Sequence, residues 1–176
     1  MRMTRFASVC SLMFLTASGL IGADAPKTFQ VSEFTFNRPE KWEWVETTSA
    51  MRKAQLKVPG KNKDESAEVV FFYFGEGNGG GTKANVERWL GQFQNQPSPK
   101  IEEGKIGTHK VTYVQVEGTY MSGMPGGPRT PQPNSMLNGA IIEGGNGNVF
   151  IKMTGPAALV KSATADFRKM VESAAK

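Results

Sequence analysis

The sequence is poor in the residues that most enzymes and metal proteins use for chemistry. Its 176 residues include one cysteine, Cys10, and one histidine, His109. Such a chain cannot build a disulfide framework or a zinc site of several Cys and His ligands. The serine-nucleophile motif G-x-S-x-G and the phosphate-loop ending G-K-[ST] are also absent. We therefore predict a protein that is not an enzyme and that holds no cofactor or metal.

The N-terminus has the anatomy of a secretory signal peptide. Arg2 and Arg5 form a short basic region, an apolar stretch covers residues 6–21, and small residues follow. This apolar stretch is shorter than the ~20 residues that a membrane-spanning helix needs. We place the cleavage site after Ala23, because a cut two residues later would leave Pro26 as the first mature residue.

Cleavage there changes both the thiol content and the charge of the chain. It removes Cys10, so the mature protein has no cysteine, and it lowers the formal net charge from +5 to +3. A mild basic excess without a clustered basic face argues against nucleic-acid binding. The residues before the cysteine, Ala-Ser-Val at 7–9, do not form a lipobox. We expect a periplasmic or extracellular protein without a lipid anchor.

The pattern of the remaining chain predicts one α+β domain over residues 34–176, preceded by a lead-in over 24–33. Alternating or wholly apolar stretches indicate strands, and apolar residues at i, i+3, i+4 and i+7 indicate helices. Short connections such as Asn146-Gly147 are typical of antiparallel hairpins. The expected fold is an antiparallel sheet sandwiched by helices. We predict strands at 29–36, 50–58, 67–74, 100–107, 110–120, 137–143 and 148–154, and helices over 82–96, capped by Thr82, and after Pro156.

A glycine-rich loop joins one predicted strand to the first predicted helix. Gly75, Gly77 and Gly80 match the pattern G-x-G-x-x-G. This pattern binds dinucleotides only within parallel βαβ units, which antiparallel hairpins do not provide. We therefore interpret the loop as a sharp turn that brings the helix against the sheet. A small-ligand site for an anion or nucleotide at the start of helix 82–96 stays open as the alternative function.

The predicted helix 82–96 also carries a polar stripe beside its apolar one, and a long Gly- and Pro-rich loop follows at 121–135. Loops on a rigid scaffold commonly carry recognition, and an aromatic next to a guanidinium at the border of the two stripes could offer a binding edge. We therefore predict a contact surface that joins the helix to this loop. Its candidate residues are Asn85, Arg88, Trp89, Gln92, Met121, Met124 and Arg129. The alternative is an ordinary helix shoulder with Trp89 in the core.

Three other chemistries have weaker support. Met121, Met124 and Met136 could bind Cu(I) in an exported protein, although methionines more often provide adaptable apolar contacts. His109 lies near the start of a predicted strand, where an exposed histidine needs no special role. Acidic side chains are scattered through the strands, and their spacing singles out no catalytic pair. These acids are Glu33, Glu46, Glu68, Glu117 and Glu143.

Four stretches, FFYFGEGNGGGTKANVERWLGQF, VEGTY, MLNGAII and FIKMTGPAALV, occur in this order within residues 34–173. Together they resemble a family of exported bacterial proteins that includes lipoproteins. The resemblance implies the PsbP-like α/β/α sandwich, and it implies a binding or accessory module of the cell envelope rather than an enzyme. It brings no catalytic residues with it. The expected partner is an envelope protein or a small ligand, and not a nucleic acid.

Overall fold

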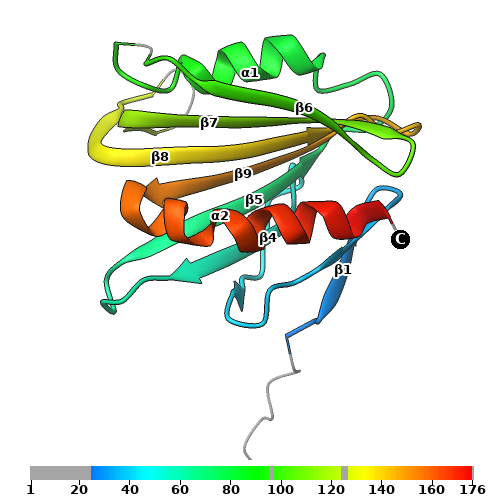
Figure 1. The fold of residues 1–176 in the computed structure, drawn as a ribbon, viewed down its shortest axis with the longest axis horizontal. Helices are drawn as coiled ribbons and strands as arrows, with labels where there is room; N and C mark the ends of the chain where they lie inside the picture. Colours follow the sequence, from blue (N-terminus) through cyan, green and yellow to red (C-terminus); the bar gives the residue numbers. More distant parts are fainter. Residues whose placement is uncertain (1–24, 96, 124–126, 176) are drawn as a thin grey trace, which may run out of the picture.

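The computed structural model describes residues 25–95, 97–123 and 127–175 (Figure 1). The predicted signal peptide lies outside the described residues. A seven-stranded antiparallel sheet dominates the domain, and its strand order is β3-β4-β5-β9-β8-β7-β6. Its strands are β3 (Glu43–Trp44), β4 (Arg52–Pro59), β5 (Ser66–Tyr73), β6 (Lys100–Ile106), β7 (His109–Ser122), β8 (Thr130–Ile142) and β9 (Val149–Pro156).

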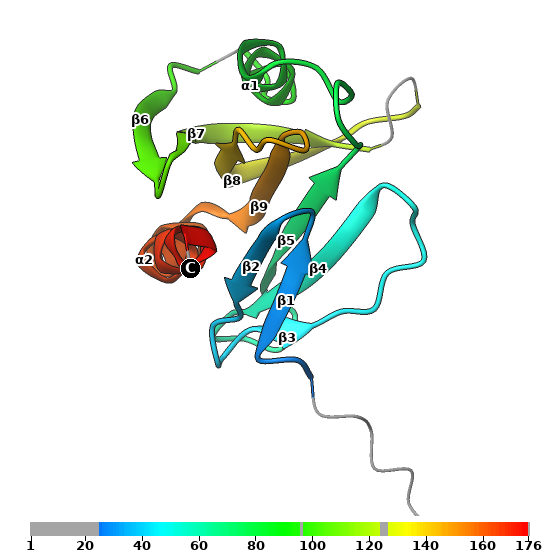
Figure 2. The ribbon, with the colours of Figure 1, turned by 90° about the vertical axis from the view of Figure 1, so that its right-hand side faces the viewer.

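Helices cover the sheet from both sides, as Figure 2 shows. Helix α2 (Ala157–Glu172), followed by the short helix η1 (Ser173–Ala175), packs on one face together with a separate hairpin of β1 (Thr28–Val31) and β2 (Phe34–Asn37). Helix α1 (Thr82–Leu90) packs on the other face. None of the helices within the described residues is long and apolar enough to cross a membrane. The predicted antiparallel α+β sandwich is confirmed.

The larger core lies under α2 and follows from the alternation of side chains along the strands. Val69 and Phe71 of β5 point into this core, whereas Phe72 faces the side of α1. Phe71 is fully buried and contacts the rings of Phe29 and Phe36, with ring centroids 4.9 Å and 5.0 Å away. The β1–β2 hairpin is therefore attached to the sheet through an aromatic cluster.

The N-terminal part of the domain departs from the predicted boundaries. The structure has two strands where we predicted one over 29–36, because Ser32 adopts a positive φ of 55° and reverses the chain. Strand β1 lies within the range expected to be a lead-in, yet Phe29 and Val31 are buried. These residues belong to the core.

Strands β7 and β8 are longer than predicted, so they take up most of the expected loop 121–135. Met121 pairs with Pro131 and Ser122 pairs with Thr130, which leaves a connection of residues 123–129. Composition alone suggested a loop because prolines lack the N–H that a strand donates. Here Pro131 and Pro133 occupy the part of β8 that pairs with β7 but not with β9. The side of β8 that would face β9 has no partner strand there, so it needs no N–H donor.

Helix α1 is shorter than predicted, since it ends at Leu90 and not at residue 96. After the helix the chain pairs with β7 instead. The N–H of Gln94 donates to the carbonyl of Thr119 at 2.9 Å, and the N–H of Met121 donates to that of Gln92 at 2.7 Å. Competing tertiary hydrogen bonds thus unwind a segment whose apolar spacing is helical.

Two predicted turn features are also different. The residue that caps α1 is Gly81, and Thr82 is the first residue of the helix, with its hydroxyl bonded elsewhere. The connection between β8 and β9 is longer than a two-residue turn at Asn146-Gly147. The carboxylate of Glu33 accepts hydrogen bonds from the N–H of Gly145 (2.7 Å) and the side chain of Asn146 (2.9 Å), which stabilises this wider loop.

A small cavity of about 150 Å³ lies between α2 and the sheet, where one buried hydroxyl has no partner. The phenol oxygen of Tyr113 is buried and makes no hydrogen bond to the described residues. The guanidinium of Arg168 lies 4.4 Å from the Tyr113 ring centroid and binds the carboxylate of Glu102. Desolvation raises the pKa of Tyr113 to about 12, with a further contribution from Glu172.

This pKa predicts a loss of stability in strong alkali. The phenol of an unfolded chain ionises near pH 10, whereas Tyr113 stays protonated to about pH 12 in the folded protein. The unfolded state therefore binds fewer protons in this window, and the free energy of unfolding falls as the pH rises from 10 to 12. Urea titrations across this range should show the decline, and Tyr113→Phe should reduce it. An equal decline in the variant would assign the effect to other groups.

Candidate functional site

Helix α1 covers only part of its face of the sheet and leaves a hollow on each side. One hollow lies between α1 and the strands β6 and β7 and has a volume of about 760 Å³. We call it the β6 groove. The other lies over β4, β5 and β9 and the far ends of β7 and β8, with a volume of about 1020 Å³. We call it the open-face groove.

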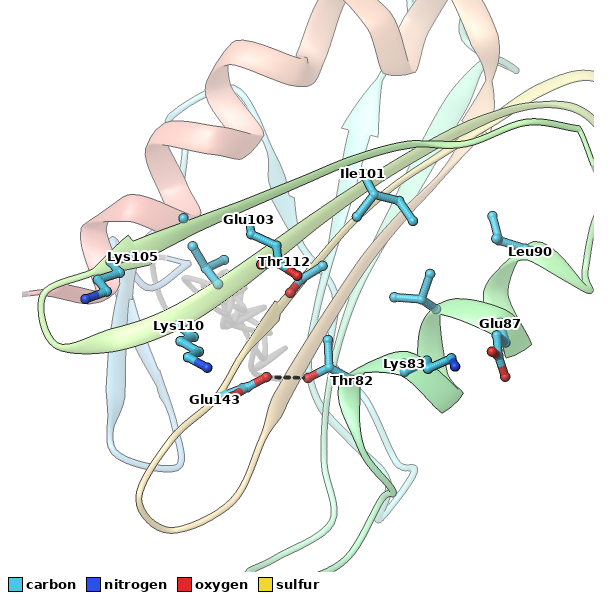
Figure 3. Close-up of a pocket in the computed structure, with 13 residues that line it drawn as sticks. Thr82, Lys83, Glu87, Leu90, Ile101, Glu103, Lys105, Lys110, Thr112 and Glu143 are labelled. Atoms are coloured by element: carbon cyan, nitrogen blue, oxygen red, sulfur yellow. Dashed lines mark hydrogen bonds between the residues drawn. The ribbon is translucent and has the colours of Figure 1, made fainter.

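The β6 groove is mainly apolar, with a charged rim (Figure 3). Ile101 on β6 and Leu90 on α1 line it from opposite sides, and Ile101 is 49% exposed. Lysines and glutamates balance one another around the rim, so the groove has no net charge with which to select a ligand. These residues are Lys83, Lys105 and Lys110, and Glu87, Glu103 and Glu143.

A carboxylate already lies beside the first residue of α1. The Thr82 hydroxyl donates a hydrogen bond to the Glu143 carboxylate at 2.7 Å, as Figure 3 shows. Anions bind near a helix N-terminus because its N–H groups point outward and carry partial positive charge. A phosphate at this end of α1 would meet the negative charge of Glu143. The geometry therefore does not favour the anion or nucleotide site that the glycine-rich loop suggested.

Asn85 has a structural position within this loop. Its side chain is 3% exposed and donates to the carbonyls of Gly79 (2.9 Å) and Gly81 (3.0 Å). Gly79 has a φ of +83°, and a Cβ there would lie 2.7 Å from the Phe74 ring. Only glycine satisfies both conditions. The loop is thus shaped by packing and by the Asn85 amide.

Trp89 and Arg88 occupy different environments, although we predicted both on one surface. Trp89 is 5% exposed and lies in the core under α1. A Cβ on Gly139 of β8 would lie 2.4 Å from the Trp89 ring, so this glycine makes room for the indole. Arg88 is exposed and donates to the Asn85 side chain at 2.8 Å. The structure places Trp89 and Asn85 inside the protein and leaves Arg88 at the surface.

The open-face groove collects the other predicted site residues. Gln92, Met121 and Arg129 all line it, whereas Met124 lies outside the described residues. Met136, the third methionine of the copper alternative, is buried in the core on the opposite face of the sheet. Across residues 25–95, 97–123 and 127–175, no cluster of three or more His, Cys, Asp or Glu side chains could hold a metal ion.

A lysine that we did not predict lies in this groove. The Lys152 ammonium donates to the Gln92 side-chain oxygen at 3.1 Å and to the Tyr120 hydroxyl at 3.2 Å. It also lies 5.5 Å from the centroid of the Tyr120 ring. The sequence contains one signal for it, because Lys152 interrupts an apolar stretch, VFIKM, in a strand with neighbours on both sides.

A second polar cluster lies on β4 and β5, in the same groove. The Glu68 carboxylate accepts hydrogen bonds from Arg52 at 2.7 Å and from Gln55 at 2.9 Å. The charged residues that line the groove are the cations Arg52, Arg129 and Lys152 and the anions Asp64 and Glu68. The groove therefore carries one excess positive charge.

Comparison with known proteins shows the fold. No family model matches the chain, and no curated protein matches its sequence. The solution structure of the cyanobacterial PsbP protein CyanoP from Synechocystis has a TM-score of 0.50 at 9% identity, with 90% of this chain and 96% of that chain covered. The crystal structure of PA94, a Pseudomonas aeruginosa protein of unknown function, has a TM-score of 0.44 at 15% identity, covering 83% and 93%. The chain has the PsbP-like fold.

Proposed function

We propose that the protein is an exported, non-catalytic binding module of the cell envelope that contacts a partner protein through the open-face groove. One observation carries this proposal. The groove lies on the central strands β5 and β9, yet it carries, beside apolar residues such as Val70 and Phe72, two clusters of polar side chains that are hydrogen-bonded to one another. A sheet face that served only packing would be apolar and covered. An uncovered, ordered polar face supports recognition.

The chemistry of the groove supports binding rather than catalysis. Glu68, its central carboxylate, is bonded to both Arg52 and Gln55 and so is not poised as a base. Among the described residues that line the groove there is no histidine or cysteine. Its polar groups instead form a broad surface, which suits a protein partner better than a small substrate.

The N-terminal region is compatible with cleavage after Ala23. Arg38 donates hydrogen bonds to the carbonyls of Pro26 (2.7 Å) and Ala25 (3.3 Å). Cleavage after Ala23 would leave both of these residues in the mature chain. We also propose that the protein belongs to the exported family that its sequence resembles. On this proposal it lies in the periplasm or outside the cell and carries no lipid anchor.

Site-specific photocross-linking in the producing bacterium tests this function. Gln132 lines the open-face groove, so a benzoylphenylalanine at this position should form one discrete protein adduct. The same residue at Lys169, which is exposed on α2, should not form it. Arg129→Glu reverses a charge in the groove and should remove the adduct obtained from position 132.

Two results would contradict the proposal. One is the same set of adducts from positions 132 and 169, which would indicate random collision. The other is an adduct from position 132 that persists unchanged with Arg129→Glu and with a second groove variant, Gln92→Ala. Fractionation of the same cells locates the protein, and recovery of the full-length chain in the cytoplasm alone would contradict export.

A further inference from the structure

We propose that Lys152 anchors the partner by binding a carboxylate, so that the partner inserts an aspartate or glutamate side chain into the open-face groove. This inference rests on the proposed function, which identifies the open-face groove as the contact surface. It adds the chemistry of the group that the site recognises.

The position of Lys152 is unusual for a lysine. It lies on β9, where it pairs with Val70 of β5 on one side and Gly139 of β8 on the other, and its side chain is partly buried. No carboxylate of the described residues forms an ion pair with it. A partly buried ammonium without a directly bonded counterion loses hydration that only a close opposite charge offsets. An acidic partner would supply the missing charge.

The hydrogen bonds of Lys152 leave one donor for a ligand. An ammonium has three N–H groups, and those of Lys152 reach two neutral acceptors, Gln92 and Tyr120. The Tyr120 hydroxyl donates in turn to Gln92 at 3.2 Å, which fixes all three side chains relative to one another. An ammonium that is held in place before binding loses less conformational entropy when the partner arrives.

The charge of the groove also favours a carboxylate over a phosphate. The groove has one excess positive charge, so an anion is favoured. Phosphates are typically bound by bidentate arginine or by several cations together. Of the two arginines that line the groove, Arg52 is already bonded to Glu68 and Gln55. Arg129 is exposed and lies outside the hydrogen-bonded cluster of Lys152, Gln92 and Tyr120. A single ammonium beside a neutral amide and a phenol suits the single charge of a carboxylate.

An NMR titration of the full mature chain tests this assignment. Three probes are compared: N-acetyl-glutamate amide, its neutral isostere N-acetyl-glutamine amide, and inorganic phosphate. The first should shift the signals of the Lys152 ammonium, the Tyr120 ring and the Gln92 side-chain amide in a saturable way at millimolar concentration. The neutral isostere should not shift them, and phosphate should bind more weakly.

Two lysine variants supply the control. Lys152→Met keeps the length and apolar stem of the side chain but removes its charge, and it should weaken binding by about tenfold or more. Lys169→Met changes an exposed lysine on α2 and should bind the probe like the parent. Lys152→Arg keeps the charge and should retain most of the binding. Thermal melting confirms that each variant is folded.

Equal binding of the glutamate probe by Lys152→Met would overturn the proposal, and so would equal or tighter binding of phosphate by the parent. The cross-linking experiment separates this inference from the proposed function. If the adduct from Gln132 survives in Lys152→Met at the parental yield, carboxylate anchoring is wrong while the groove remains the contact surface.

Discussion

Trp89→Ala is expected to lower the free energy of unfolding by about 3–5 kcal/mol, the cost of truncating a large buried aromatic residue. Trp89 is 5% exposed and is the largest side chain of the smaller core, under α1. Its indole occupies the space that Gly139 leaves on β8, so the alanine creates a cavity between helix and sheet. Urea unfolding followed by circular dichroism measures the change.

Gly139→Ala should destabilise the protein as well, because its Cβ would lie 2.4 Å from the Trp89 ring. The double variant should cost less than the sum of the two single changes, since the smaller residue at 89 removes the clash. Phe74→Ala provides the control. Phe74 is 37% exposed, so its loss should cost clearly less than that of Trp89. Similar costs for both residues would contradict the packing described for α1.

Phe71→Ala is expected to cost a similar amount, about 3–5 kcal/mol, and in addition to loosen the β1–β2 hairpin. Phe71 is fully buried on β5, and its ring contacts Phe29 of β1 and Phe36 of β2. The hairpin is not part of the main sheet, so these contacts hold much of it in place. Hydrogen exchange of the β1 and β2 amides should become faster in the variant.

The neighbouring residue is a matched control for this prediction. Phe72 has the same side chain on the same strand but faces α1 and is only partly buried. Phe72→Ala should cost less and should leave exchange in the β1–β2 hairpin unchanged. Equal acceleration of exchange by both variants would show that the hairpin depends on the stability of β5 and not on the aromatic cluster.

The fold was predictable where the sequence pattern reports burial directly. Strand β4 alternates between apolar and polar residues because one of its faces is covered, and β5 is an apolar run because both of its faces are covered. The end of α1 was not predictable in this way. Its apolar spacing continues to Phe93, but hydrogen bonds from β7, which lies far along the chain, unwind the last turn.

The site was only partly predictable, because a helical pattern shows which residues share a face but not what that face contacts. Gln92 was a candidate for its place on a polar stripe, and the structure places it in the open-face groove. Trp89 lies next to Arg88 at the border of the polar and apolar stripes, and the structure decides for burial, with the indole packed over Gly139. Lys152 was missed because its two partners come from distant segments of the chain.

The order of strands has a consequence for how the chain matures. Strand β9 lies between β5 and β8, as Figure 1 shows, although it follows both in the sequence. The two halves of the sheet therefore cannot join before residues 149–156 are available, and pairing across so long a separation is slow. The complete sheet therefore forms only once the last strand of the sequence is in place, and a chain that ended before residue 149 could not assemble it.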